Sequence, residues 1–492
     1  MVLAEQVAEN IAADIAAEIE TTLAAGGDQP DRFDLKEAWY PVFYVKDLDP
    51  QRPQKFTLLG QDLVIWWEAS TQTWRAFVDR CPHRLVPLSQ GRINEQGLLE
   101  CPYHGWTFSG SGRCEQIPQA EPGTAATQSP RACAQSLPTA IAQDLLFIYP
   151  GQPDRATHTP IPIIPALAED AEDAADWLCL NTFRDLPYDA LTLLENVLDS
   201  SHVPFTHHKS VGNRATAGPL NLNVTTSDRQ GFQGFWPEGP RQGKLGSQHT
   251  FFVAPSLMWH DLTAKQFGRT LTVVYATPIR KGECRLFARF PFKFNAKLPR
   301  LILKLRPEWF SHISQNAILE DDQLFLYAQE RYLDQRLAEL GGQAQFSKAF
   351  YLATPGDRYV DALHRWRRDY CPSPELESDN PDQHRDQEDF KPQPDDALLE
   401  RYYSHTIHCQ SCRGALRRIQ QLQRLSKVGL VLSLVAAPLI LALPRSLSPA
   451  SSLLFACILS GLVLLSAGSW WGLSALEQRF YKGRLVPPRN QA

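Results

Sequence analysis

Two short motifs, each with one thiol and one imidazole, constrain this chain more than any other feature. Cys81-Pro82-His83 is followed, after seventeen residues, by Cys101-Pro102-Tyr103-His104. Two cysteines and two histidines can hold zinc, but zinc fingers use C-x2-4-C and H-x3-5-H spacing, which is not the spacing here. The better match is a 2Fe-2S site in which two imidazoles replace two thiolates on one iron. A zinc ribbon or two unrelated pairs is the alternative interpretation.

The residues around the two motifs favour the iron–sulfur interpretation. Arg84 and Gly91 follow the first motif, and residues 105–108 read Gly-Trp-Thr-Phe after the second. The stretch resembles the Rieske domain of ring-hydroxylating and related Rieske oxygenases. Rieske subunits of cytochrome bc complexes carry one more cysteine in each loop, and Val86 and Tyr103 occupy those places here. The resemblance is therefore to the oxygenase type, and it implies four cluster ligands: Cys81, His83, Cys101 and His104.

A second iron site is expected downstream, because oxygenase-type Rieske clusters pass electrons to a second iron. Asn196, Asp199, His202 and His207 match the N-x2-D-x2-H-x4-H pattern of Rieske oxygenases. Non-haem Fe(II) oxygenases bind iron with two imidazoles and one carboxylate on one face. Asn196, Asp199 and His202 are three residues apart and share one side of a helix. His208 is a rival ligand, but the four-residue gap favours His207.

The family resemblance implies catalytic roles for Asp199 and Asn196. In Rieske oxygenases the aspartate links an iron histidine to a Rieske histidine of a neighbouring subunit, because the two metals of one chain lie too far apart. Asp199 is therefore expected to connect the mononuclear iron with His83 or His104 across an interface, and a homotrimer follows. The alternative for Asp199 is an ordinary helix-surface carboxylate.

The iron carboxylate is expected near the start of a long helical pattern that runs from Pro307 to Leu340. Related monooxygenases place an acidic pair there, with the second acid as ligand and a glutamine seven residues later. Asp322 and Gln329 fit that spacing, and Asp321 is an open alternative.

The order of strand-like and helical patterns predicts an α+β fold. An all-β Rieske domain is followed by a helix-grip-like catalytic domain and a C-terminal transmembrane helical hairpin. The expected segments are a 1–28 amphipathic helix, a 29–155 Rieske domain, a 156–370 mononuclear-iron domain, a 371–400 acidic linker, a 401–426 CxxC segment, a 427–476 hairpin and a 477–492 basic tail.

Composition narrows the class of protein. A chain of 492 residues is long enough for two or three domains. The formal net charge of -5 gives no basic excess, so nucleic acid is not an expected partner. Ten cysteines argue against a disulfide scaffold and for a reducing compartment. The first 25 residues are acidic and lack the features of a secretory or transit peptide.

Two uncharged stretches near the C-terminus predict the membrane hairpin. Val428–Pro444 has seventeen residues without a charge, and Ser446–Leu476 has another thirty-one. A membrane-spanning helix needs about 20 apolar residues, so the first stretch is short and the second sufficient. Basic residues precede and follow the pair, whereas the connecting loop holds only Arg445. Both ends, and with them the iron centres, are therefore expected on the cytoplasmic side.

The C-terminal part narrows the family. Residues 405–416 read His-Thr-Ile-His-Cys-Gln-Ser-Cys-Arg-Gly-Ala-Leu and precede the hairpin. This resembles pheophorbide a oxygenase and its relatives, the lethal-leaf-spot and Rieske translocon proteins. The resemblance implies a lipophilic tetrapyrrole substrate, ferredoxin as electron donor and a thylakoid or plasma membrane location in a cyanobacterium. The chain carries no credible nucleotide-binding fingerprint, so a separate ferredoxin or reductase is required.

Three interpretations of Cys409 and Cys412 are open. The pair is favoured as a redox-regulated dithiol, with thioredoxin as a candidate partner. With His405 and His408 the pair is also a candidate zinc site, and inert thiols are the third option.

Two rival functions also stay open. The first is a redox sensor or translocon component that uses only the cluster and the dithiol. The second is an anchored oxygenase of a different lipophile or of a small amine.

Overall fold

The computed structural model describes residues 32–121, 123–264, 268–341, 346–371, 392–441 and 449–491. The expected N-terminal helix and most of the expected acidic linker lie outside these ranges. The chain divides into two compact units: Met1–Leu305 with Phe325–Pro392, and Arg306–Leu324 with Gln393–Ala492. They are called the first and the second unit below.

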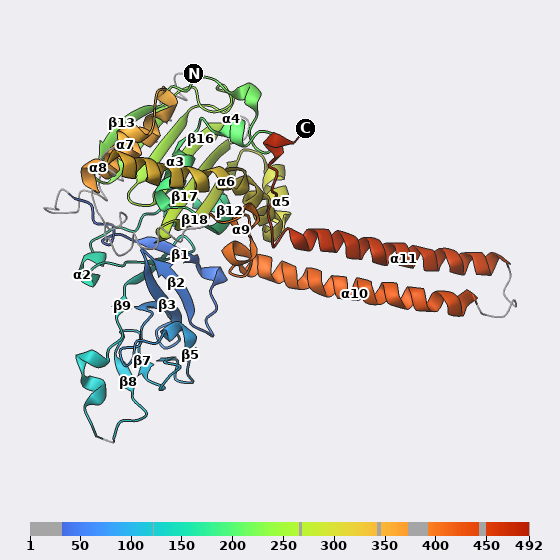
Figure 1. The fold of residues 1–492 in the computed structure, drawn as a ribbon, viewed down its shortest axis with the longest axis horizontal. Coiled ribbons are helices and arrows are strands. Elements are labelled where there is room, and N and C mark those ends of the chain that lie inside the picture. The colour runs from blue at the N-terminus through green and yellow to red at the C-terminus, as the bar shows by residue number, and fades with distance from the viewer. Residues whose placement is uncertain are drawn as a thin grey trace. The chain divides into compact units, whose positions relative to one another are not determined.

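The N-terminal part of the first unit consists of three small antiparallel sheets (Figure 1). Their strand orders are β2-β3-β4-β9, β5-β6-β7-β8 and β1-β11-β10. In β3 four consecutive residues from Leu63 are buried, because both faces of this strand are covered. The strands are β1 (Tyr40–Tyr44), β2 (Gln54–Leu58), β3 (Gln61–Glu68), β4 (Thr73–Val78), β5 (Arg92–Ile93), β6 (Leu99–Glu100), β7 (Thr107–Phe108), β8 (Cys114–Gln116), β9 (Ser136–Leu137), β10 (Thr139–Ala142) and β11 (Leu145–Ile148).

The rest of the first unit is built on a seven-stranded antiparallel sheet of order β12-β18-β17-β16-β15-β14-β13. The helix α3 (Ala190–Leu198) packs on β17 and β18, and α8 (Arg358–Tyr370) packs on β13 and β14. The expected α+β fold is confirmed. The strands are β12 (Leu178–Leu186), β13 (Asn223–Asp228), β14 (Gly231–Trp236), β15 (Gln248–Val253), β16 (Leu257–Ala264), β17 (Gly268–Arg280) and β18 (Glu283–Phe294).

The helix α6 (Glu308–Leu340) is continuous, and its second half belongs to the first unit. Glu330 fixes this half to the start of α3, because its Oε2 accepts hydrogen bonds from the Asp189 N–H (2.6 Å) and the Thr192 hydroxyl (2.7 Å). The remaining short helices of this unit are α2 (Pro153–Ala156), α4 (Val203–Thr206), α5 (Lys297–Leu305) and α7 (Phe346–Ala349).

The second unit combines the first half of α6 with α9 (Asp395–Leu398), α10 (Gln410–Leu441) and α11 (Pro449–Gln478). The helices α10 and α11 lie side by side and antiparallel (Figure 1). α10 runs without a break across residue 427, where the sequence predicts the start of the hairpin. Among the described residues one helix, Leu453–Gln478, is long and apolar enough to span a membrane, with a mean hydropathy of 2.0.

Candidate metal centres

The two Cys/His loops of the first unit have the same backbone design. Cys81 follows β4 and Cys101 follows β6. In the first loop the Cys81 carbonyl accepts from the Leu85 N–H and the Cys81 N–H donates to the Val86 carbonyl, both at 2.9 Å. In the second loop the Cys101 carbonyl accepts from the Gly105 N–H (3.2 Å), and the Cys101 N–H donates to the Trp106 carbonyl (2.8 Å). Leu85 and Gly105 both have positive φ, 61° and 70°, so each chain turns back at the equivalent position.

This design points the thiols inward and the imidazoles outward. Cys81 and Cys101 are buried in the core around Trp66, whereas His83 is exposed and His104 half-buried. The two imidazole centroids are 4.6 Å apart. Burial raises the pKa of the Cys81 thiol to about 12, so a bound iron would have to supply the charge that keeps this sulfur as a thiolate. Two buried sulfurs and two outward imidazoles fit a cluster that exchanges electrons at the protein surface.

The candidate mononuclear site starts where α3 ends. Asp199 is the C-cap of α3, and α4 places His207 one turn after His202. His202 Nδ1 lies 2.5 Å from the Asp199 backbone carbonyl, which fixes the tautomer and leaves Nε2 free to bind a metal. The two Nε2 atoms are 3.3 Å apart. Bonds of about 2.1 Å to one ion place two nitrogens about 3.0 to 3.4 Å apart, so this pair fits a single metal.

Asp199 reaches from His202 to the surface. Its Oδ1 accepts hydrogen bonds from the Ser201 N–H (2.7 Å) and hydroxyl (2.5 Å), and its Oδ2 lies 3.9 Å from His202 Nδ1. The Asp199 side chain is 29% exposed. Asn196, one turn earlier on α3, is half-buried. Asp199 is therefore both adjacent to a candidate iron ligand and accessible from outside the chain.

The structure reveals two positioning residues that the sequence analysis missed. His260 on β16 accepts a hydrogen bond from the Thr250 hydroxyl (2.8 Å) at Nδ1, and its Nε2 lies 2.9 Å from the Val197 carbonyl of α3. Burial lowers the pKa of His260 to about 4, so the ring is neutral and Nε2–H is the donor to α3. His364 Nε2 lies 2.6 Å from buried Glu195, also on α3. Neither contact has a sequence signal, because the partners are 63 and 169 residues apart.

The acidic candidates on α6 lie in the second unit. Asp321 and Asp322 are both buried. Their neighbour Glu320 forms an ion pair with Arg401, with N–O distances of 2.6 and 2.5 Å. Asp322 and Gln329 share one face of α6, because seven residues complete about two helical turns.

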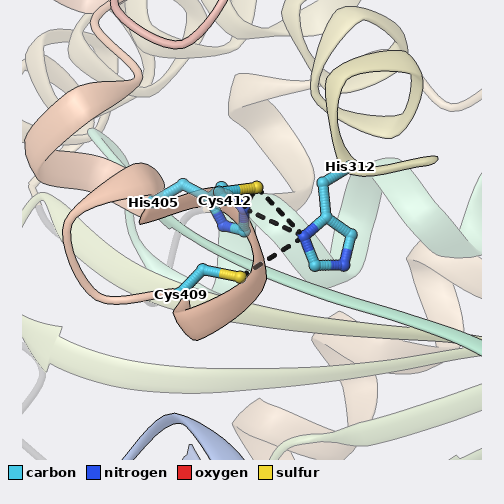
Figure 2. A group of neighbouring side chains, drawn as sticks. All are labelled: His312, His405, Cys409 and Cys412. Carbon is cyan, nitrogen blue, oxygen red and sulfur yellow. Dashed lines mark hydrogen bonds between the residues drawn. The ribbon is translucent and has the colours of Figure 1, made fainter. Parts of the chain in front are cut away.

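Cys409 and Cys412 are buried beside two histidines, His312 and His405 (Figure 2). Hydrogen bonding to Cys412, His312 and His405 lowers the pKa of the Cys409 thiol. His408, which the sequence analysis offered as a zinc ligand, is exposed and outside this group. The zinc alternative in that form is wrong, because the turn that points His405 inward leaves His408 at the surface.

Comparison with known proteins identifies the family of this chain. Residues 38–139 match the family model of the Rieske [2Fe-2S] domain, and residues 252–339 match that of pheophorbide a oxygenase. Pheophorbide a oxygenase of Arabidopsis thaliana is 36% identical over 92% of this chain and 85% of the relative. The chain belongs to the pheophorbide a oxygenase family. Another family relative, flavonoid 8-hydroxylase 2 of Ocimum basilicum, is 32% identical over 83% of this chain and 79% of the relative. The names of both relatives describe them as chloroplastic.

A solved structure shows the same fold. Dicamba monooxygenase bound to dicamba superposes with a TM-score of 0.52 at 21% identity, over 68% of this chain and 96% of that one. The Rieske domain and the family together show that this chain is a Rieske non-haem iron oxygenase. It uses a 2Fe-2S cluster and a mononuclear iron, takes electrons from a ferredoxin-type donor and acts on a small molecule.

Proposed function

We propose that this chain is a membrane-anchored oxygenase of a chlorophyll-derived tetrapyrrole similar to pheophorbide a. The observation that carries the proposal is the 36% identity to Arabidopsis pheophorbide a oxygenase, which extends over 92% of this chain. Flavonoid 8-hydroxylase 2 is also a relative, so a flavonoid is the second candidate substrate.

For the mononuclear iron we propose the ligands His202, His207 and Asp322, with Asp321 as the alternative acid. The imidazole pair and the burial of the acid support this choice. Bound Fe(II) would supply the O2 chemistry of the family. The role of the protein would be to keep His202 in one tautomer through the Asp199 carbonyl and to hold α3 in place through His260.

We propose that electrons reach this iron from a neighbouring subunit through Asp199, in a homotrimer. In Figure 1 the cluster loops beside β5 and β7 lie at one end of the first unit and α4 lies at the other, which supports transfer between chains. Exposed His83 on one subunit and partly exposed Asp199 on the next would be the contact points.

We propose that α10 and α11 anchor the chain in a membrane. Large apolar side chains on both helices are exposed, such as Leu432 (63%) and Leu464 (73%). Lys427 lies over the ring of Trp470, at 5.4 Å, and Trp471 is exposed beside it. Tryptophan and lysine are typical of the membrane–water interface, so this level marks the membrane surface.

A helix of the first unit, α5, also supports membrane association. The helix α5 exposes apolar side chains at four positions with helical spacing and carries basic residues between them. Such a helix lies in the interface of an anionic bilayer. The apolar positions are Leu298, Leu301, Ile302 and Leu305, each more than half exposed. A thylakoid or plasma membrane of a cyanobacterium is the proposed location, with the catalytic residues on the cytoplasmic side.

Single-turnover oxidation tests the proposed function. The iron-replete chain is reduced chemically, mixed with pheophorbide a and O2, and examined for an oxygenated product by mass spectrometry. A flavonoid is tested in the same way as the second candidate substrate. The control is His202→Ala, which should keep the Rieske electron-spin-resonance signal and form no product. Product from the flavonoid alone would replace the tetrapyrrole proposal. No product from either, with normal cluster reoxidation, would favour another lipophile or the sensor alternative.

A further inference from the structure

The buried group of two cysteines and two histidines in the second unit is separate from both iron centres. His312 projects from the first turns of α6, and His405 from a π-helical turn at Tyr402–Thr406. Cys409 precedes α10 and Cys412 lies in its first turn (Figure 2). All four side chains are buried, and their four ligand atoms lie within 4.8 Å of one another.

The distances in this group match the coordination shell of one small ion. His312 Nδ1 is 3.2 Å from His405 Nε2, 3.4 Å from Cys412 Sγ and 3.5 Å from Cys409 Sγ. Tetrahedral zinc, with bonds of about 2.3 Å to sulfur and about 2.05 Å to nitrogen, separates two nitrogens by about 3.3 Å and sulfur from nitrogen by about 3.5 Å. A second 2Fe-2S cluster does not fit, because its thiolates and imidazoles bind different irons and would stand farther apart.

We propose that His312, His405, Cys409 and Cys412 form a structural zinc site. Burying four polar metal-binding groups together is costly unless they share a ligand, and a tetrahedral set of two sulfurs and two nitrogens is typical of zinc. All four coordination positions are filled by protein atoms, which is the arrangement of a structural rather than a catalytic zinc. The other ring nitrogen of His312 faces Glu308 at 3.7 Å, so a carboxylate stands behind this imidazole as in many zinc sites.

The proposed zinc joins the beginning of α6 to the base of α10. α6 also carries Asp322, ten residues and about 15 Å after His312. The metal therefore fixes the helix that supplies the proposed iron carboxylate to the segment that enters the membrane. The site would stabilise this helix without taking part in oxygen chemistry.

Metal analysis of the full chain, purified in detergent after growth with iron and zinc, tests the proposal. We expect one equivalent of zinc per chain in addition to iron, and X-ray absorption at the zinc edge should show two sulfur and two nitrogen neighbours. His312→Ala and Cys412→Ser should each lower the zinc content at least tenfold, while the Rieske electron-spin-resonance signal persists. His408→Ala is the matched control, because this exposed histidine is one residue from Cys409 and should leave the zinc in place.

A measurement on the wild-type chain keeps the proposal testable if the variants fail to fold. Replacing zinc by Co2+ should give thiolate-to-cobalt absorption and the visible bands of tetrahedral cobalt. A wild-type chain without zinc, with two thiols that a thioredoxin reduces from a disulfide, would overturn the proposal in favour of the redox dithiol. Iron at this site, or an X-ray absorption spectrum without sulfur neighbours around the zinc, would overturn the proposal as well.

Discussion

Replacing Gly212 by alanine should weaken the mononuclear iron site without altering a ligand. A Cβ atom at Gly212 would lie 2.1 Å from the Val203 carbonyl oxygen and 3.3 Å from the His207 carbonyl carbon. Ordinary contacts begin near 3.4 Å, so the two segments have to separate by more than 1 Å. Val203 accepts the His207 N–H at 3.2 Å, and Gly212 donates to the His207 carbonyl at 2.8 Å. Separation therefore acts directly on the backbone of His207.

The size of the effect follows from this overlap. Overpacking of this kind costs about 1 to 3 kcal/mol. If the strain is borne by the metal-bound state, iron binding weakens roughly 5- to 160-fold. The assay is titration of Fe(II) into the chain, with the Rieske signal as an internal reference that should not change. Gly218→Ala is the control, because nothing lies within 4 Å of its Cβ position. Wild-type iron affinity in Gly212→Ala would refute the reasoning.

Three further changes test separate parts of the molecule. Asp199→Asn should leave both metals bound and slow substrate-dependent cluster reoxidation about 10- to 100-fold, as measured by stopped flow, and normal turnover would exclude the inter-subunit route. His83→Cys should lower the cluster potential toward about -400 mV in a redox titration, and an unchanged potential would mean that His83 is not a ligand. Burial and Asp189 raise the pKa of Glu330 from 4.5 to about 8. Protonated Glu330 therefore stabilises the folded chain; this contribution is fully present below pH 4.5 and is lost as the pH rises through about 8. Glu330→Gln should therefore flatten the fall in Tm between pH 5 and 8, and parallel Tm curves would contradict the pKa assignment.

The parts of the sites that are local in sequence could be predicted. Each Cys/His loop closes within five residues through its own backbone hydrogen bonds, so its spacing is readable from the chain. The distance from Asp199 to His202 is likewise set by the end of one helix. The α+β fold followed from the same local patterns, because strand and helix periods are properties of short segments.

Contacts between distant segments could not be predicted. His312 is 97 residues from Cys409, and no spacing rule connects them. Sequence proximity offered His405 and His408 together, but the π-helical turn directs His405 inward and exposes His408. The choice between Asp321 and Asp322 also stays a prediction, because adjacent helical residues differ only in which face they occupy and both are buried.

The Rieske cluster has to take part in two electron transfers, one from the donor and one toward the mononuclear iron. His83 and His104, the proposed histidine ligands of the cluster, are flanked by Leu85 and Tyr103, which are 66% and 57% exposed. Exposed apolar side chains beside outward imidazoles indicate a face that a protein covers. If a neighbouring subunit covers this face to bring Asp199 near His83, the electron donor has to approach from another side of the cluster. Entry and exit of electrons would then use different edges, and binding of the donor would not require the trimer to open.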